Sequence, residues 1–539
     1  MFRIFHDNDF KKELFKLALP VVIQEILVFL VNTANAFILK VIKGDAAFNG
    51  TTSANDVFYI FNIILLSFVF AGSVFAAQYT GKKDTQSVRK IFNLSLKIAF
   101  ILSLIFTISC LIWPVQIISA LTDGSGNIEF GAGYLRVFAI AFIFRGLGAM
   151  YYYSIKNAEK TKLIYILSII TFALNVGLTS AFCYVPFSNE SMGAAIAATL
   201  ARFIELVLLI IFTWKMEDTR FSLKYFLHTD PEMLSQYFKY TLAILGSRIC
   251  WGAGDLLLTK VVVNHIQFSG ETMQMAFITA NNTVTTVRNL VTCSTAGITA
   301  ASSVLIGREL GANKLSEAHK HSKDIMRFLL VLAAFNITMS FAYAPLFMIS
   351  VDKTVDYKSF TQLVWAMSGI YAISYLAQVY NAVINDSFFS IGGDRAAMFI
   401  SNGLFMWVIV VPLSLTAYFL KWDPLVIFTI ANGEEIVKCW ANILRYYQKH
   451  WIKNIVNPKD NQIGEITYKY INNKSKKGVD ASFSYKTFVV HRFVPSKLKE
   501  KQAIKEAKNE IMIQQEYGYL KKYAEQYFKA CLDDKEFAI

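Results

Sequence analysis

About a dozen apolar segments fill residues 14 to 446, and they constrain the fold more than any other feature of the chain. Segments such as 57–77, 91–113 and 163–185 have about the 20 residues that a helix needs to cross a bilayer core of roughly 30 Å. Continuous apolar runs favour helices, because an open strand leaves backbone hydrogen-bonding groups unsatisfied in lipid. The short alternating segments of a membrane barrel are absent from the sequence. We therefore predict an all-α polytopic membrane protein.

Composition and charge agree with this class. The chain is 55% hydrophobic and only 17% charged, and its net charge is +14. Lys and Arg concentrate in loops that follow even-numbered segments, such as 82–90 and 308–327, which the positive-inside rule places in the cytoplasm together with both termini. This distribution accounts for the positive charge without a nucleic-acid partner. We expect a multi-pass protein of the plasma membrane that acts as a monomer.

Neither the cysteines nor the histidines form a recognisable site. The six cysteines are scattered without paired or metal-type spacing, and the seven histidines contain no paired set. The sequence also lacks a nucleophile motif. We therefore expect no catalytic residue, no metal site and no cofactor, and the chain is not predicted to be an enzyme.

The apolar segments predict twelve transmembrane helices. Their expected bounds are 14–39, 54–79, 88–113, 131–155, 162–185, 192–214, 237–264, 272–305, 322–349, 358–387, 395–420 and 424–446. The first six form one lobe at residues 1–219, a cytoplasmic linker follows at 220–236, and the other six form a second lobe at 237–451. A basic cytoplasmic tail occupies 452–539, and its pattern predicts a helix at 497–532. We expect this tail to contact the anionic leaflet or a cytoplasmic partner.

The two halves repeat each other. FKLAL at 15–19 opens the first segment and FKYTL at 238–242 opens the seventh, while Gly81 and Gly311 centre two equivalent basic loops. Ser154 and Ser390 mark a third matching position. Because both lobes start on the same side and contain six spans, the repeat is parallel, with its axis along the membrane normal. A substrate site is then expected between the lobes.

Polar residues follow one face of several predicted spans. An ionisable group at the bilayer centre costs roughly 2.5–3.5 kcal/mol, so such faces should line protein or water. The eighth and tenth spans carry the longest faces, which predict the walls of a substrate cavity and also fit ordinary interhelical hydrogen bonding. The cavity candidates are Asn32, Asn35, Arg248, Trp251, Asn281, Thr285, Arg288, Thr292, Tyr371, Ser374, Tyr375, Gln378, Asn381 and Asn385. Asp255 shares a face with Arg248 and is the first candidate for binding a coupling ion.

These features resemble those of the multidrug and toxic compound extrusion (MATE) transporters of the multidrug/oligosaccharidyl-lipid/polysaccharide (MOP) exporter superfamily. The resemblance covers residues 12 to 453. Matching pieces are LALP at 17–20, AQYTGKKD at 77–84, GAAIAATLARFIE at 193–205, GRELGANKLSEA at 307–318, SIGGDRAA at 390–397, WVIVVPL at 407–413 and RYYQKHWIKN at 445–454. Their order, spacing and duplication carry the assignment more than any single piece.

The resemblance implies two six-helix lobes in a V and alternating access. It also implies export of small organic, usually cationic and drug-like, compounds in exchange for H⁺ or Na⁺. Family members commonly carry an aspartate late in the first span, where this chain has Asn35. An amide cannot exchange a proton in this pH range. Ion coupling would then fall to Asp56, Glu25 or Asp255.

Three other functions remain open from the residues. Arg145, Arg248 and Arg288 could form a cationic floor that holds a phosphate, which favours a flippase or an exporter of a lipid-linked or anionic precursor. A polytopic enzyme is disfavoured because no metal or nucleophile cluster is present. A receptor would use the tail as its output, and only the tail favours that function.

Overall fold

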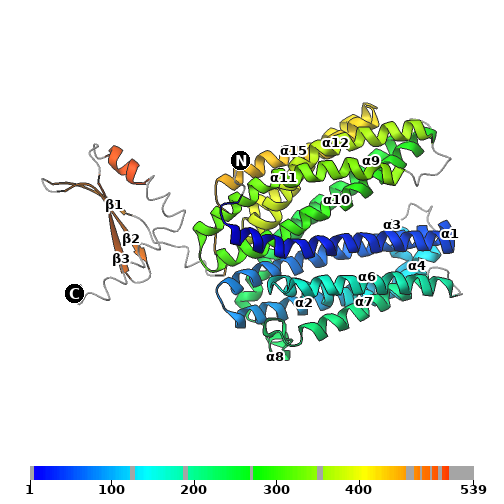
Figure 1. Cartoon of the computed structure of the whole chain (residues 1–539), viewed down its shortest axis with the longest axis horizontal. Coiled ribbons are helices and arrows are strands. Elements are labelled where there is room, and N and C mark those ends of the chain that lie inside the picture. The colour runs from blue at the N-terminus through cyan, green and yellow to red at the C-terminus, as the bar shows by residue number, and fades with distance from the viewer. Residues whose placement is uncertain are drawn as a thin grey trace.

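The computed structural model describes residues 5–121, 128–185, 192–266, 271–348, 356–456, 467–473, 476–485, 488–495 and 501–508. Within this part of the chain, helices form two lobes that lie side by side (Figure 1). The first lobe runs from residue 5 to residue 213 and the second from residue 231 to residue 447. This arrangement confirms the all-α membrane fold that the sequence predicts.

The first lobe begins with α1, which spans Asn8–Gly81. It continues with α2 (Thr85–Ile112), α3 (Pro114–Leu121), α4 (Ile128–Phe138), α5 (Ala141–Asn157), α6 (Thr161–Tyr184) and α7 (Met192–Thr213). The short elements η1 (Glu217–Thr219) and α8 (Leu223–Leu227) then lead to the second lobe. Helices α4 and α5 are apolar and long enough together to cross a membrane, and they meet at a bend of 52°.

The second lobe begins with α9 (Pro231–Ile266), α10 (Glu271–Gly311) and α11 (Leu315–Met348). Helix α12 (Tyr357–Val383) continues into the π-helical turn η3 (Ile384–Phe389). The next span combines α13 (Arg395–Phe399), the π-helical turns η4 (Ile400–Leu404) and η5 (Met406–Val410), and α14 (Val411–Phe419). The lobe ends with α15 (Pro424–Tyr447).

Helix α1 contains two membrane spans, at Asn8–Leu39 and Ala54–Gly81. Gly297 of α10 lies against the backbone of Ala18, and Gly311 of the same helix lies against the backbone of Gln78. A straight helix would separate Ala18 from Gln78 by about 90 Å, whereas Gly297 and Gly311 are only about 21 Å apart at 1.5 Å per residue. The helical chain must therefore double back between the two spans, as the sequence predicts.

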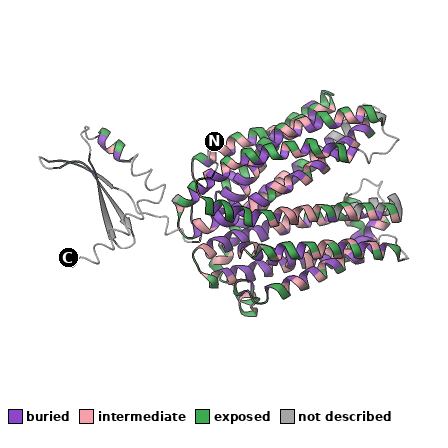
Figure 2. Ribbon diagram, viewed as in Figure 1, coloured by how far each residue is buried: buried purple, intermediate pink, exposed green. Residues whose placement is uncertain are grey.

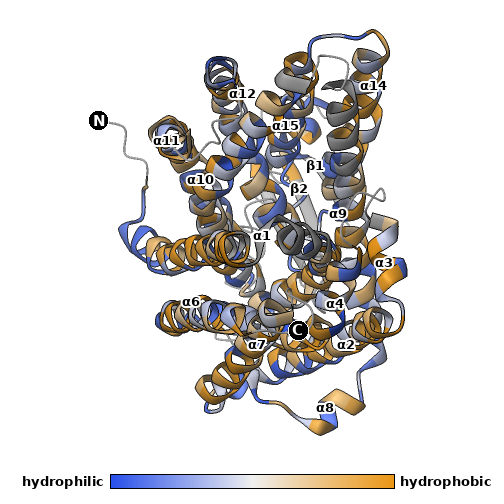
Figure 3. Ribbon diagram, turned by 90° about the vertical axis from the view of Figure 1, so that its right-hand side faces the viewer, coloured by the Kyte–Doolittle hydropathy of each residue, from blue (hydrophilic) through white to orange (hydrophobic). Residues whose placement is uncertain are grey.

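Nine helices in the described residues are long and apolar enough to cross a membrane, or ten if the bent pair α4–α5 is counted as one span. Helices α9 and α15 are not among them, since both combine apolar residues with several ionisable ones. The count of twelve spans therefore stays a prediction. Viewed from one end of the bundle, hydrophobic residues cover the outer faces of α2, α6 and α7 (Figure 3). Large apolar side chains such as Phe203 and Ile211 are exposed there, as expected of a surface that faces lipid.

The lobes share a core at one end and have separate cores at the other. The shared core contains Leu14 and Phe75 of the first lobe, Ile306 and Phe388 of the second, and Trp451, which follows α15. Two further cores lie within the first lobe and within the second lobe. Buried residues accordingly concentrate where the lobes meet (Figure 2). We call this end, which carries Gly81, Gly311 and Trp451, the closed end, and the opposite end the open end.

Two equivalent glycines bring the lobes into backbone contact at the closed end. A Cβ atom on Gly81 would lie 2.0 Å from the carbonyl oxygen of Arg308, and one on Gly311 would lie 1.9 Å from that of Gln78. Real Cβ atoms do not approach so closely, so only glycine fits at either position. Two residues after each glycine, Lys83 and Asn313 have φ near +60°. The repeat seen in the sequence is therefore also a repeat of backbone conformation.

The segment Trp451–Val456, which we call the strap, ties the two lobes together after α15. Gln78 of α1 donates from Nε2 to the carbonyl oxygen of Ile391 at 2.8 Å, and its Oε1 accepts from the backbone N–H of Ile455 at 2.8 Å. Trp451 is fully buried and stacks on Phe388 with ring centroids 5.0 Å apart. The boundary expected at residue 451 therefore falls inside a packed core.

Two truncated variants distinguish the contribution of the strap to stability from that of the tail. A chain that ends at Val456 should insert and remain stable, because it keeps every strap contact. A chain that ends at Lys449 loses the buried Trp451, and such a loss costs about 3–5 kcal/mol. Thermal melts of the two detergent-purified variants check this expectation. Equal melting temperatures would show that the strap does not support the fold.

The described part of the tail contains strands that the sequence analysis did not predict. Strands β1 (Thr467–Asn473), β2 (Lys476–Tyr485) and β3 (Phe488–Pro495) form an antiparallel sheet in the order β1-β2-β3. Residues 501–508 are helical, within the helix expected at 497–532. The remainder of that predicted helix, at 509–532, lies outside the described residues.

Candidate functional site

Three large cavities with charged side chains in their lining lie between and within the lobes, with volumes of about 580, 390 and 330 Å³. We call them the first-lobe, second-lobe and central cavities in that order. The first-lobe and second-lobe cavities share Tyr59 and Asn62, and the second-lobe and central cavities share Arg248, Gln378 and Asp386. Each volume lies in the range of about 300–1,000 Å³ that small-molecule sites occupy.

The first-lobe cavity is lined by arginines, amides and aromatic rings. Arg145 of α5 donates from Nε to Oδ1 of Asn62 at 3.1 Å. Arg202 of α7 forms an ion pair of 2.7 Å with Glu205, three residues further along the same helix. The described lining contains these two arginines and no carboxylate. Because Glu205 neutralises Arg202, Arg145 leaves the cavity with a net positive charge.

Asn35 also lines the first-lobe cavity. Its Nδ2 donates to Oδ1 of Asn175 at 2.8 Å, while its own Oδ1 has no hydrogen-bond partner among the described residues. The amide at this position is thus one half of an asparagine pair between α1 and α6. A buried carbonyl oxygen without a partner carries a desolvation cost of about 1–3 kcal/mol, which a ligand donor would remove.

The second-lobe cavity is lined by a buried group of charges on α15. Lys438 donates from Nζ to Glu434 Oε1 at 3.1 Å and to Glu435 Oε1 at 3.3 Å. Asn381 of α12 donates to Glu435 Oε2 at 2.7 Å and accepts at 2.8 Å from Nδ2 of Asn442. The side chains of Lys438 and Glu434 are each only 4% exposed. This group is the most deeply buried set of charges at the cavities.

The central cavity combines both signs of charge. Glu25 of α1 and Lys156 of α5 line it from the first lobe, and Asp386 and Arg248 line it from the second. The Arg248 guanidinium lies 5.7 Å from the ring centroid of Phe70, a cation–π contact between the lobes. Asp386 lies in the π-helical turn η3, a type of distortion that is frequent at functional sites.

The polar face of the tenth predicted span is divided between the cavities and the core. Gln378, Asn381 and Asn385 line the second-lobe cavity. Tyr371 and Tyr375 are buried in the core of the second lobe with ring centroids 6.1 Å apart. The buried Ser374 donates to the carbonyl oxygen of Asn432 at 3.0 Å.

The remaining candidates divide in a similar way. Trp251 lines the second-lobe cavity, and Thr292 lines the central cavity. Arg288 lies over the ring of Tyr371, 5.1 Å from its centroid, outside the lining of the three cavities. Asn281 and Thr285 are half-buried nearer the start of α10, also outside that lining. The side chain of Asn32 lies outside the described residues.

The three candidates for ion coupling occupy different environments. Glu25 is half-buried and lines the central cavity. Asp255 is exposed on α9, within electrostatic range of Arg288. Asp56 is exposed on α1. Of the three, only Glu25 reaches a cavity wall in the described structure.

The sequence analysis missed the charges of α15. Glu434, Glu435 and Lys438 are spaced i, i+1 and i+4 in an apolar span, which places an acid and a base on one face. That spacing was the available signal. Asp386 was also visible in the tenth span, but its position at a π-helical turn was not.

A second interlobe contact closes the bundle beside the glycines. Arg308 of α10 forms an ion pair with Glu159 and donates to the backbone carbonyl of Asn157, both from the first lobe. Asn157 in turn donates from Nδ2 to the carbonyl oxygen of Ser73 at 3.1 Å. These contacts hold α1, α5 and α10 together at the closed end.

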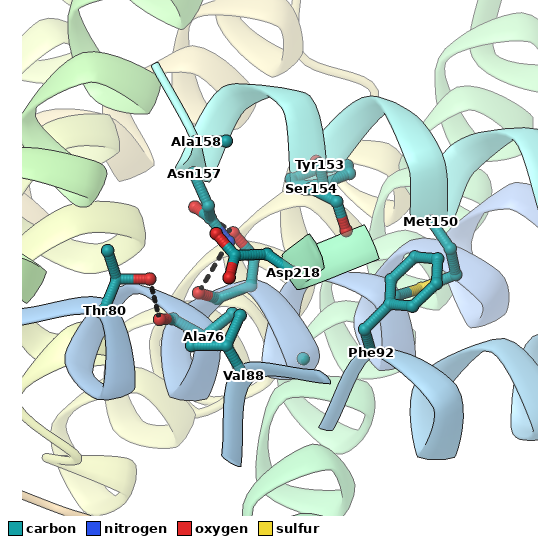
Figure 4. Close-up of a pocket in the computed structure, with 12 residues that line it drawn as sticks. Ala76, Thr80, Val88, Phe92, Met150, Tyr153, Ser154, Asn157, Ala158 and Asp218 are labelled. Carbon is teal, nitrogen blue, oxygen red and sulfur yellow. Dashed lines mark hydrogen bonds between the residues drawn. The ribbon is translucent and has the colours of Figure 1, made fainter. Parts of the chain in front are cut away.

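A small pocket of about 20 Å³, room for a water molecule, lies next to this contact (Figure 4). Asn157 and Ser73 line one side, and Asp218 of η1 reaches in from the connection between the lobes. Burial raises the pKa of the Asp218 carboxyl, and the neighbouring Glu217 raises that pKa further. The pocket is too small for an organic ligand and belongs to the closed end.

Comparison with known proteins gives a consistent result. The MatE family model matches residues 20–180. The probable multidrug resistance protein NorM of Thermotoga maritima is 27% identical over 214 residues. That match covers 39% of this chain and 46% of the relative, so the aligned region spans less than half of NorM.

Two solved structures match almost over their full lengths. An outward-facing multidrug resistance MATE family transporter of the MOP superfamily gives a TM-score of 0.73 at 15% identity, with 82% of this chain and 96% of that chain covered. A MOP superfamily transporter of Pyrococcus furiosus, whose binding pocket is described as having reverse polarity, gives 0.70 at 16% identity, with 81% and 95% covered. At these identities the likeness establishes the fold.

Proposed function

We propose that this chain is a membrane transporter, and not an enzyme, that exports small organic anions by alternating access. The match of residues 20–180 to the MatE model and the fold that the chain shares with MATE transporters support a transport function. The positive charge of the first-lobe cavity carries the proposal. A guanidinium such as that of Arg145 matches the two oxygens of a carboxylate or a phosphate. In a site that excludes water, such a cation gains most from an anionic ligand.

The aromatic lining of the same cavity supports an organic substrate. Phe58, Tyr59, Tyr134 and Phe138 line it, and apolar walls with a few polar groups are typical of small-molecule sites. The Pyrococcus furiosus transporter supports a departure from cation export, because its reverse pocket polarity is described as suggesting a different function. We therefore favour the anionic precursor of the sequence analysis over a cationic drug.

The membrane potential favours this direction of transport. A hundredfold gradient costs about 2.7 kcal/mol, at about 1.36 kcal/mol for each factor of ten. Moving one negative charge out of a cell that is negative inside by 100 mV yields about 2.3 kcal/mol, and an inward proton yields the same amount again. Exchange of an anion for H⁺ or Na⁺ can therefore sustain such a gradient. Exchange of one organic cation for one proton is electroneutral and gains nothing from voltage.

The proposal includes orientation and location. The basic loops at 82–90 and 308–327 follow Gly81 and Gly311 at the closed end, which we place in the cytoplasm with both termini. The cavities then open to the outside. A plasma-membrane location, a monomeric state and a role for the tail in binding the anionic leaflet or a cytoplasmic partner remain part of this proposal.

Export of organic cations is the second candidate. Glu25 and Asp386 in the central cavity favour it, because either carboxylate could pair with a cationic substrate. Arg248 and Lys156 line the same cavity and offset that charge. The two functions differ in voltage dependence, so one assay can separate them.

Reconstituted vesicles test the proposed function. We expect Arg145→Gln to lower uptake of a labelled aromatic carboxylate by about tenfold or more, because one charged hydrogen-bonding partner is worth about 1.5–3 kcal/mol. The matched control is Arg136→Gln, an exposed arginine of α4 in the same lobe. A potassium diffusion potential should drive the uptake. Voltage-independent transport of cations alone, unaffected by Arg145→Gln, would overturn the proposal, and transport of lipid phosphates alone would identify a flippase.

A further inference from the structure

The carboxylates Glu434 and Glu435 converge on a single ammonium inside the second lobe. Their Oε1 atoms lie 3.1 and 3.3 Å from Lys438 Nζ. Glu434 and Lys438 are 4% exposed and Glu435 is 17% exposed. Lysine is rarely so buried, and removing one member of a buried pair leaves an uncompensated charge. The three side chains therefore form one electrostatic unit.

The unit is held from a second helix. Asn381 of α12 donates from Nδ2 both to the backbone carbonyl of Glu435 and to its Oε2, each at 2.7 Å. Asn442 fixes the orientation of Asn381 by donating to its Oδ1 at 2.8 Å. Oε2 of Glu435 thus accepts a hydrogen bond from Asn381, and Oε1 accepts one from Lys438. Little freedom remains for either oxygen to take another partner.

The unit borders an accessible space. Glu435 and Lys438 line the second-lobe cavity of about 390 Å³, together with Asp386 and Asn385. The Asn385 Oδ1 atom is buried without a hydrogen-bond partner among the described residues. A cation that entered the cavity would therefore meet several oxygen atoms. The ammonium of Lys438 already lies against Oε1 of Glu434 and Oε1 of Glu435.

We infer that Lys438 acts as a tethered counter-cation, which fills the place that a sodium ion would need at Glu434 and Glu435 and so prevents sodium binding there. A tethered group competes at a high effective concentration, whereas a free ion must be drawn from solution. Without Lys438 the two carboxylates would share a buried double negative charge. Such a site attracts a mobile cation.

The inference deepens the proposed function. Its consequence is that protons and not sodium ions act as the coupling ion at this lobe, and only this consequence rests on the proposed function. Sodium binding itself is a property of the purified protein. It can be measured without any knowledge of the transported substrate. Failure of the transport proposal would therefore leave this result intact, and the reverse also holds.

Equilibrium binding of ²²Na⁺ to the purified full chain tests the inference. We expect no saturable binding to the wild type and saturable binding to Lys438→Gln, with an affinity higher by about tenfold or more, in line with the coupling energies of close charge pairs. Lys438→Arg should behave like the wild type because it keeps the charge. The double variant E435Q/K438Q should lose the binding again. Lys320→Gln, at an exposed lysine of α11, is the matched control.

A lysine with only a structural role would change the melting temperature but not the sodium dependence. A folded Lys438→Gln that binds no ²²Na⁺ would therefore overturn the inference. Saturable binding to the wild type that is lost in Glu435→Gln would overturn it as well. That second measurement can overturn the inference even if Lys438→Gln does not fold.

Discussion

Replacement of Gly311 by alanine is expected to abolish transport while leaving the protein folded. The added Cβ would lie 1.9 Å from the carbonyl oxygen of Gln78, an atom of the main chain that cannot rotate away. Alanine is the better helix former by about 1 kcal/mol, so local helix stability should not fall. The lobes would instead be forced apart at the closed end. The proposed alternating access requires that end to close, so the transport cycle should stop.

Thiol labelling measures the separation directly. Asn454 of the strap is 2% exposed and donates to the carbonyl oxygen of Gly311 at 3.2 Å. The thiol introduced by Asn454→Cys should react slowly with a polar maleimide in the wild-type background and much faster beside Gly311→Ala. Gly433→Ala is the matched control, because no atom lies within 4 Å of a Cβ at that position. Normal transport by Gly311→Ala, with the introduced thiol still unreactive, would contradict the proposed closure.

The sequence revealed the membrane helices because their signal is strong and local. A run of about 20 apolar residues has few alternatives in a bilayer. The repeat was visible for a related reason: Gly81 and Gly311 allow a backbone approach that no other residue permits, so both copies of the loop keep a glycine. The bend between α4 and α5 had no comparable signal, since neither proline nor glycine interrupts Val137–Phe142.

The cavity was harder to predict than the fold. A polar stripe on a helix shows which residues share a face, but it does not show how much of that face borders the cavity. Of the candidates predicted on α10, only Thr292, the last of them along the helix, lines the central cavity. The earlier Asn281 and Thr285 are half-buried and lie outside that lining. How much of the polar face borders the cavity depends on where along the helix the two lobes diverge. That position is set by tertiary packing.

The strap and the α15 charges were missed for different reasons. Trp451 belongs to a core that residues from both lobes complete, so its burial depends on contacts far away in sequence. A basic segment after the last span otherwise resembles an ordinary cytoplasmic tail. The charges of Glu434 and Lys438, by contrast, pair within one helical turn. Their spacing was readable, but an i,i+4 pair is equally common on solvent-exposed helices.

Substitution of Asp386 by asparagine is expected to remove proton-driven transport while leaving substrate binding intact. Asp386 lines both the second-lobe and the central cavities, and it lies within electrostatic range of Arg248 and Lys438. Lys438 already holds Glu434 and Glu435, and Glu25 lines only the central cavity, so Asp386 is the acid in the described lining that is best placed to exchange a proton between the two cavities. An amide cannot exchange a proton in this pH range.

A pH gradient imposed on vesicles separates this role from that of Asp255. Asp386→Asn should retain voltage-driven movement of the substrate and lose its response to the pH gradient, since only the proton-carrying group has been removed. Asp255→Asn is the matched comparison, because Asp255 is an exposed carboxylate on α9 outside the lining of the three cavities. If Asp255→Asn alone abolished the response, coupling would belong to the residue that the sequence favoured. The proton would then enter from the face of α9, and Asp386 would have no part in the coupling.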